Sequence, residues 1–365
     1  MDRRQEYETK IARLRQLMVE SRLDGLLLST PANFSWATAG GNAVVSSIAP
    51  LAAASLLVLS DHVYVLCSNI EAGRIADEEV GELGCEVRPF DWFRGEVHKA
   101  ARKLCRGRLG ADHGARGFKD LSGQIAPFRF SLCEAEVERY RKVGQATGEG
   151  LGEAMRSLRA GIRECEAAGR LREALSARGL ESVVTLAAAD ERIAKYRHPV
   201  VTEKAAQETI MLVTCARRWG LIAAASRIVR FAPVTHELRR KHDATVFVDA
   251  TMMAATRPGV AFADILQRGV QAYRMRRFGR EWKLHHQGGP TGYAPREFVA
   301  TPREKRCVVA NQAIAWNPSI TGTKSEDTIL ALADRTEIVT ESPEWPRIVV
   351  ETGDQIIRRP DLLVL

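Results

Sequence analysis

Residues 283–297 read KLHHQGGPTGYAPRE and place two adjacent histidines, His285 and His286, before a run rich in glycine. A phenol, a guanidinium and a carboxylate follow closely, carried by Tyr293, Arg296 and Glu297. Glycine lets the backbone adopt positive φ and approach a ligand closely. The stretch therefore predicts a bend at the rim of a binding or catalytic site, and a solvated loop is the alternative.

The whole-chain composition is that of an ordinary globular protein. The chain has 365 residues, enough for two domains, and 45% of them are hydrophobic. Its seven cysteines are scattered and form no Cys-x-x-Cys pair, so we expect a reducing cytoplasm rather than a disulfide framework or a zinc ribbon. The charged N-terminus and the lack of an apolar run of about eighteen residues predict no signal peptide and no membrane partner.

The formal net charge of +8 raises the question of a nucleic-acid partner. Much of the excess is arginine interleaved with Glu and Asp, and no zinc-finger, RNA-recognition or basic-zipper pattern accompanies it. We therefore expect no nucleic-acid binding, and interpret the charge as a solvated face or as attraction for an anionic small-molecule substrate.

The first third of the chain alternates helical and strand-like patterns. Apolar residues at helical spacing predict a helix over residues 1–23, and a short helix is expected at residues 33–36. Further helices are expected around residues 70–80 and 94–105, and strands at residues 25–29, 54–59, 63–66 and 85–88. This alternation predicts a small α/β domain that ends near residue 133.

From Glu134 the composition changes to long charged helices with apolar stripes, expected at residues 134–158 and 162–179. Strands are then expected at residues 183–187, 209–214, 220–225, 312–317, 326–331 and 336–340, and helices at residues 234–254 and 261–278. The second part of the chain therefore mixes helices and strands as well.

Several short segments in this order resemble the pita-bread superfamily of methionine aminopeptidase, aminopeptidase P, prolidase and creatinase. They are Tyr196-Arg197-His198-Pro199, the strand pair that ends in Ala225-Ser226-Arg227, the run His286-Gln287-Gly288-Gly289, Asn317-Pro318 and Ser325-Glu326-Asp327-Thr328. The resemblance covers almost the whole chain. It implies an α/β (α+β) protein, with a creatinase-like N-terminal α/β domain over residues 1–133 and a pita-bread domain over residues 134–365.

Most members of this superfamily bind two divalent metal ions through carboxylates and one histidine, and here the pattern departs. The resemblance places Val213 and Ala224 at the two aspartate positions, Gly289 at the histidine position and Asn317 at a glutamate position, so that Glu326 alone remains. A divalent ion needs several anionic oxygens or imidazoles at once. We therefore expect a site with no metal and no other cofactor.

Three residues are the candidates for catalysis in such a site. Without a metal to activate water, a side chain must do so, and the pKa of histidine suits this work near neutral pH. His198, at a substrate-side histidine position of the superfamily, is expected to be the general acid/base. Glu326 would be the second catalytic group, or else a former ligand paired with an arginine, and His286 would bind or polarise the substrate.

Substrate binding is expected from His285, Arg296, Glu297, Tyr293 and Asn317. The guanidinium of Arg296 suits a bidentate grip on a carboxylate, and a salt bridge to Glu297 or Glu326 is the alternative. Because adjacent side chains on an extended backbone point to opposite faces, we expect only one of His285 and His286 to face the pocket. Trp316 lies in an apolar run and is expected in the core.

Three functions are compatible with these residues. One is a metal-independent hydrolase of a carbon–nitrogen (amide or amidino) bond in a small carboxylate-bearing or peptide-like substrate, in the manner of creatinase. The others are a lyase-type biosynthetic enzyme on a specialised metabolite and a catalytically inactive pita-bread binding module. The resemblance also implies a homodimer in which Asn33, Phe34 and Trp36 contribute to the partner's pocket.

Overall fold

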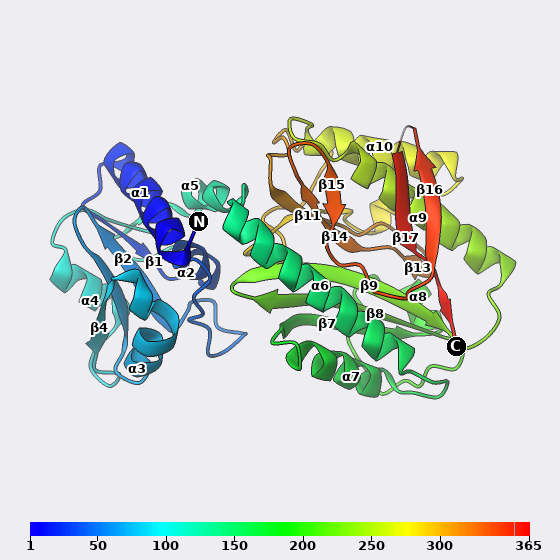
Figure 1. Cartoon of the computed structure of the whole chain (residues 1–365), viewed down its shortest axis with the longest axis horizontal. Helices are drawn as coiled ribbons and strands as arrows, with labels where there is room; N and C mark the ends of the chain where they lie inside the picture. Colours follow the sequence, from blue (N-terminus) through cyan, green and yellow to red (C-terminus); the bar gives the residue numbers. More distant parts are fainter. Residues whose placement is uncertain (354) are drawn as a thin grey trace. The chain divides into compact units, whose positions relative to one another are not determined.

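The computed structural model describes residues 1–353 and 355–365, which form two compact units (Figure 1). The first unit comprises Met1–Arg129 with Glu134–Glu136, and the second comprises Phe130–Cys133 with Val137–Leu365. Within the described ranges, no helix is both long and apolar enough to span a bilayer.

The N-terminal unit is built on one six-stranded sheet in the order β4-β3-β2-β1-β5-β6. Its strands are β1 Gly25–Leu28, β2 Ala54–Leu59, β3 Val63–Ser68, β4 Glu86–Phe90, β5 Leu109–Ala111 and β6 Lys119–Asp120. Its helices are α1 Arg3–Ser21, α2 Pro31–Ala37, α3 Ala72–Arg74, α4 Val97–Leu104 and α5 Ser122–Ile125, with a π-helix at Ile75–Val80 and 3-10 turns at Gly81–Leu83 and Ala126–Arg129. Helix α1 begins with a capping box between Asp2 and Gln5, which satisfies two of its free backbone N–H groups.

The three residues expected to reach into a partner's pocket are buried inside this unit. Phe34 and Trp36 are 0% and 1% exposed, and Asn33 is 3% exposed. The amide nitrogen of Asn33 donates to the carboxylate of Asp112 at 2.8 Å, and Asp112 also accepts from the backbone N–H of Ser29 at 2.8 Å. These contacts fix α2 against the end of β5, so Asn33, Phe34 and Trp36 leave little surface with which to contact another subunit.

A long buried hairpin is the centre of the C-terminal unit. Its strands are β8 Thr209–Arg218 and β9 Leu221–Arg230, joined by Trp219 and Gly220, both at positive φ as a tight two-residue hairpin turn requires. The hairpin lies between β7 Glu181–Ala189 and β18 Leu363–Val364 in the order β18-β9-β8-β7. Helices α6 Glu134–Arg156 and α7 Glu164–Ser176 lie along this sheet (Figure 1), and α8 Glu191–Lys195 follows β7.

A second sheet, in the order β10-β11-β14-β15, packs under two helices. The strands are β10 Gly288–Thr291, β11 Gln312–Trp316, β14 Asp327–Ala331 and β15 Thr336–Ile338, and the helices are α9 His236–Ala255 and α10 Phe262–Met275. Trp316 is 0% exposed in their shared core, where its indole N–H donates to Thr256 at 2.9 Å. Trp316 is therefore a core residue, as its sequence context predicts.

Two short ladders complete the unit. The pair β12 Ser319–Ile320 and β13 Thr323–Lys324 lies between β11 and β14 in the chain, and the hairpin of β16 Arg347–Thr352 and β17 Gln355–Pro360 packs on α9. The pair β12 and β13 is the one that bears on the site, because β13 ends at Lys324, two residues before Glu326.

Candidate active site

His198 lies in the loop between α8 and β8, and its neighbour Arg197 fixes that loop. The guanidinium of Arg197 forms an ion pair with Glu281 at 2.7 Å and donates to the hydroxyl of Thr321 at 2.9 Å. Glu281 begins the 3-10 helix Glu281–Leu284, which ends directly before His285. One ion pair therefore joins the two segments that carry the site histidines.

The three histidines form a cluster. Nε2 of His198 and Nε2 of His285 are 3.1 Å apart, and the ring centroids of His198 and His286 are 5.8 Å apart. The rings of His285 and His286 stack with a centroid distance of 4.5 Å and an interplanar angle of 28°. The expectation that only one of the adjacent histidines faces the site is wrong, because the chain bends at His285 and enters β10 only at Gly288.

Burial and nearby charge keep these imidazoles neutral. Desolvation, followed by the positive charge of Lys324 and the neighbouring imidazoles, lowers the pKa of His285 to about 3. Desolvation and then Arg296 lower the pKa of His286 to about 4. The pKa of His198 is also lowered, first by desolvation and then by Lys324. The cluster is therefore uncharged near pH 7 and can accept protons.

Glu326 is held by two cations and a hydroxyl. Oε2 of Glu326 lies 2.7 Å from the ammonium of Lys324 and accepts a hydrogen bond from Ser226 at 2.5 Å. Its Oε1 lies 3.4 Å from the guanidinium of Arg296. Burial alone would raise the pKa of this carboxyl, but Lys324, Arg296 and Ser226 lower it to about 2. Glu326 is therefore ionised at any physiological pH, and two positive charges face one negative charge.

Sequence reasoning missed Lys324 and Ser226. The side chain of Lys324 is only 6% exposed, which is rare for a lysine without a partner. The signal was its position two residues before Glu326, because side chains two apart in extended backbone share a face. For Ser226 the sequence offers only a place at a strand end; an isolated bridge between Ser226 and Glu326 brings its hydroxyl to the carboxylate.

The first part of the glycine-rich run is strand β10, the predicted bend follows at residues 292–295, and packing explains the glycines of the strand. Gly289 has φ +153°, and a Cβ built there would lie 2.6 Å from the carbonyl oxygen of Phe298 and 3.0 Å from the nitrogen of Ala300. Gly288 is at φ +97° and is pressed against the backbone of Ala315 in the next strand. No side chain, and so no metal-binding histidine, fits at position 289 without moving this backbone.

The residues at the superfamily's metal positions do not fit a two-metal centre. Val213 and Ala224 are 4% and 0% exposed and belong to hydrophobic clusters of β8 and β9. Asn317 offers a neutral amide, and both carboxylate oxygens of Glu326 are already engaged by cations. Two hard or borderline divalent ions need several free anionic or imidazole donors, and this set does not supply them.

The other expected substrate-binding residues are Tyr293, Glu297 and Asn317, and the backbone N–H of Asn317 donates to the carbonyl of Gln287 at 3.1 Å. Tyr293 and Asn317 are each 3% exposed, and Glu297 is partly buried. Within the described residues, Oδ1 of Asn317 and Nε of Arg296 have no hydrogen-bond partner although they are buried. An unsatisfied buried polar atom costs about 1–3 kcal/mol. Two buried polar atoms of the expected substrate-binding residues are therefore left unsatisfied.

The next acidic residue, Asp327, belongs to a separate buried ion network. Asp327 pairs with Arg227 at 3.0 Å and with Arg359 at 2.7 Å, and Arg359 also pairs with Asp249 at 2.7 Å. Burial raises the pKa of Asp249 to about 6. The network links β9, β14, β17 and α9, so Asp327 supports the strand that presents Glu326 and is not free for chemistry.

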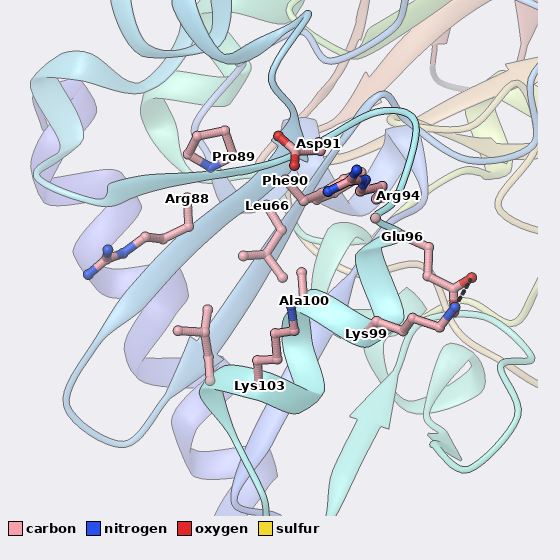
Figure 2. Close-up of a pocket in the computed structure, with 12 residues that line it drawn as sticks. Leu66, Arg88, Pro89, Phe90, Asp91, Arg94, Glu96, Lys99, Ala100 and Lys103 are labelled. Carbon is pink, nitrogen blue, oxygen red and sulfur yellow. Dashed lines mark ion pairs between the residues drawn. The ribbon is translucent and has the colours of Figure 1, made fainter.

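A cavity in the N-terminal unit is the main alternative location. It has a volume of about 420 Å³ and lies between β3, β4 and α4. Figure 2 shows Leu66 next to Ala100 in it, and Lys99 extended toward Glu96, 3.6 Å away. Its twelve lining residues include basic and acidic side chains but no histidine, serine or cysteine. The imidazole groups that suit acid/base chemistry near neutral pH are therefore in the histidine cluster and not in this cavity.

Comparisons with known proteins agree with the fold. A model of metallopeptidase family M24 matches residues 138–334, which is more than half of the chain. Among curated protein sequences, no match was found.

Solved structures resemble the whole chain. A prolidase from Pyrococcus horikoshii OT3 has a TM-score of 0.78 at 16% identity, covering 92% of this chain and 98% of that one. A Xaa-Pro dipeptidase from Bacillus anthracis has a TM-score of 0.78 at 16% identity, with coverages of 98% and 100%. The N-terminal domain of FACT complex subunit SPT16 from chickpea (Cicer arietinum) has a TM-score of 0.67 at 11% identity, with coverages of 93% and 95%. The expected pita-bread fold and its mixed α/β class are thereby confirmed.

Proposed function

Because the chain belongs to metallopeptidase family M24, we propose that it is a hydrolase of a carbon–nitrogen bond that works without the family's two-metal centre. The substrate is a small molecule or short peptide that carries a carboxylate next to an amide or amidino group. The observation that carries the proposal is the charge of the site. The two positive charges of Lys324 and Arg296 exceed the single negative charge of Glu326. The excess positive charge attracts an anionic group.

His198 acts as the general base. When its Nε2–H donates to Nε2 of His285, its Nδ1 keeps a free lone pair, and the His198 side chain is exposed. Nδ1 takes a proton from water while the water oxygen attacks the carbonyl or amidino carbon. The same proton then passes to the leaving nitrogen as the carbon–nitrogen bond breaks, so the histidine returns to its neutral form.

Lys324 and Arg296 stabilise the negative charges of the substrate and of the transition state. Negative charge develops on the oxygen or nitrogen of the attacked group, and the buried ammonium of Lys324 stabilises it in a poorly solvated place. Arg296 binds the substrate carboxylate through its guanidinium, whose Nε is unpaired among the described residues. Glu326 keeps both cations in position, and His286 lies beside them as a neutral donor.

The experiment is a substrate panel with protein stripped of metal by a chelator. Xaa-Pro dipeptides and creatine are compared with the same molecules in which the carboxylate is amidated. We expect turnover of at least one carboxylate-bearing compound, and a large rise in KM for its amidated form. Absence of turnover across the panel, or indifference to the carboxylate, contradicts the proposal.

A second candidate is a non-catalytic binding module. Its support is the tight apolar packing of Val213 and Ala224, together with the structural likeness to a FACT subunit domain. Saturable binding of a carboxylate-bearing peptide with no turnover, weakened in Arg296→Ala, would favour this function over hydrolysis.

A further inference from the structure

We propose that His198, His285 and His286 form a site for one divalent transition-metal ion, separate from the family's carboxylate metal positions. One ring nitrogen from each of the three residues lies within 4.8 Å of the other two. Imidazole nitrogen is a preferred ligand of Zn²⁺, and three histidines with one open position are an established ligand set. Binding at this site does not depend on the proposed hydrolysis.

The distances are compatible with capture of an ion. Two nitrogens bound at about 2.0–2.1 Å to one tetrahedral zinc lie roughly 3.3 Å apart. Nε2 of His198 and Nε2 of His285 are already 3.1 Å apart. His198 is exposed and lies on a loop, so its ring can adjust without repacking a core. The ring of His286 completes the set within the limit of 4.8 Å.

The protonation state favours an ion as well. A metal must displace any proton on the ring nitrogen that binds it, and an imidazole with the ordinary pKa of about 6.5 is mostly neutral at pH 7. Nδ1 of His285 is buried without a hydrogen-bond partner among the described residues, so this cluster is not a fully satisfied structural arrangement. The backbone N–H of Gly288 donates to Nδ1 of His286 at 3.3 Å, and binding through Nε2 would give up this long contact.

The surrounding charges set the limits of affinity. Lys324 and Arg296 repel a cation, while Glu326 offsets one of their two charges. Water occupies the open fourth position in such sites. The structure therefore assigns reversible capture of a borderline ion rather than permanent retention. An ion bound to His198 also removes the base of the proposed reaction, so Zn²⁺ inhibits hydrolysis; this consequence rests on the proposed function.

The test is calorimetric titration of Zn²⁺ into the chelator-treated full-length protein, with Co²⁺ absorption to report the coordination. We expect one Zn²⁺ per chain at micromolar concentration. His198→Ala and His286→Ala should each weaken binding by at least about tenfold. His236→Ala, which removes an exposed histidine at the start of α9, is the matched control and should bind as the wild type does.

The outcomes separate this site from the proposed reaction. Absence of Zn²⁺ uptake by the wild type, or equal Zn²⁺ affinity in His198→Ala, overturns the metal site. Neither result bears on hydrolysis, which is measured separately in the presence of chelator. Because His198 is exposed, its alanine variant should fold even if the variant of the more buried His286 does not. Circular dichroism of each metal-free variant checks folding before the titration.

Discussion

The ammonium of Lys324 lies 2.7 Å from Oε2 of Glu326, and both side chains are almost completely buried. The superfamily resemblance places a metal ligand at Glu326. In this chain a protein cation takes the oxygen that a metal would bind, and Arg296 pairs with the other oxygen at 3.4 Å. The positive charge of the site is therefore built from side chains, and this exchange is the basis of the account.

Glu326→Gln should destabilise the protein strongly. The change leaves Lys324 without its carboxylate in a buried place, and breaking a buried pair from one side costs about 3–5 kcal/mol. Urea unfolding followed by circular dichroism measures the free energy of unfolding. Asp334→Ala, which breaks an exposed pair with Arg335, is the control and should change it by less than about 0.5 kcal/mol. Equal changes in the free energy of unfolding for the two variants would show that Lys324 does not depend on Glu326 for its stability in the buried site.

His198→Ala should lower kcat by roughly 10²–10⁴-fold, because a general acid/base contributes about that much. Its stability should change little, since the side chain is exposed. Steady-state kinetics on the best substrate of the panel, with thermal unfolding alongside, give both readouts. His236→Ala again serves as the control, and wild-type turnover in His198→Ala would remove the proposed mechanism.

The acid limb of kcat/KM should have its midpoint below about 6.5, the ordinary pKa of histidine. The base must be neutral to act, and desolvation and Lys324 lower the pKa of His198. Lys324→Gln removes one of these causes and should move the limb toward higher pH. If the acid limb of the wild type has its midpoint at or above about 6.5, His198 is not the base.

Acid should destabilise the fold through the stacked pair. The folded-state pKa values of about 3 for His285 and about 4 for His286 are lower than the value of about 6.5 in the unfolded chain. The unfolded state therefore binds more protons below about pH 6.5, and stability contributed by the neutral rings is lost as the pH falls through that value toward 4. His286→Gln should show a smaller loss of unfolding free energy between pH 7.5 and pH 5 than the wild type, measured by urea denaturation. His236→Gln is the control and should lose as much unfolding free energy as the wild type. An equal loss in His286→Gln would contradict the lowered pKa of His286 in the folded protein.

The sequence predicted the architecture well where periodicity was strong. The helices at α6, α7, α9 and α10 and the strands of the long hairpin lie within a few residues of their expected ranges. The hairpin of β16 and β17 was not expected, because charged residues such as Arg347, Glu351 and Arg358 interrupt its apolar pattern. Its strands are stabilised by packing on α9, which is a tertiary contact.

At the site, sequence reasoning identified residue types better than their arrangement. His198, Arg296 and Glu326 were named from their positions in a family-like order, and the structure shows Arg296 paired with Glu326. The stacking of His285 and His286 depends on a local bend, fixed where Gln287 donates to the carbonyl of His285 at 2.6 Å. Such a bend follows from tertiary contacts and not from the alternation of a strand, so it could not be foreseen.

Activity in the presence of a chelator tests the central claim most directly. The protein is treated with EDTA, its metal content is checked by elemental analysis, and hydrolysis of the best panel substrate is measured with EDTA still present. The account predicts undiminished turnover, higher if residual zinc had occupied His198. Loss of activity in EDTA, restored by stoichiometric Mn²⁺, Co²⁺ or Zn²⁺, would contradict it and return the site to the metal chemistry of its family.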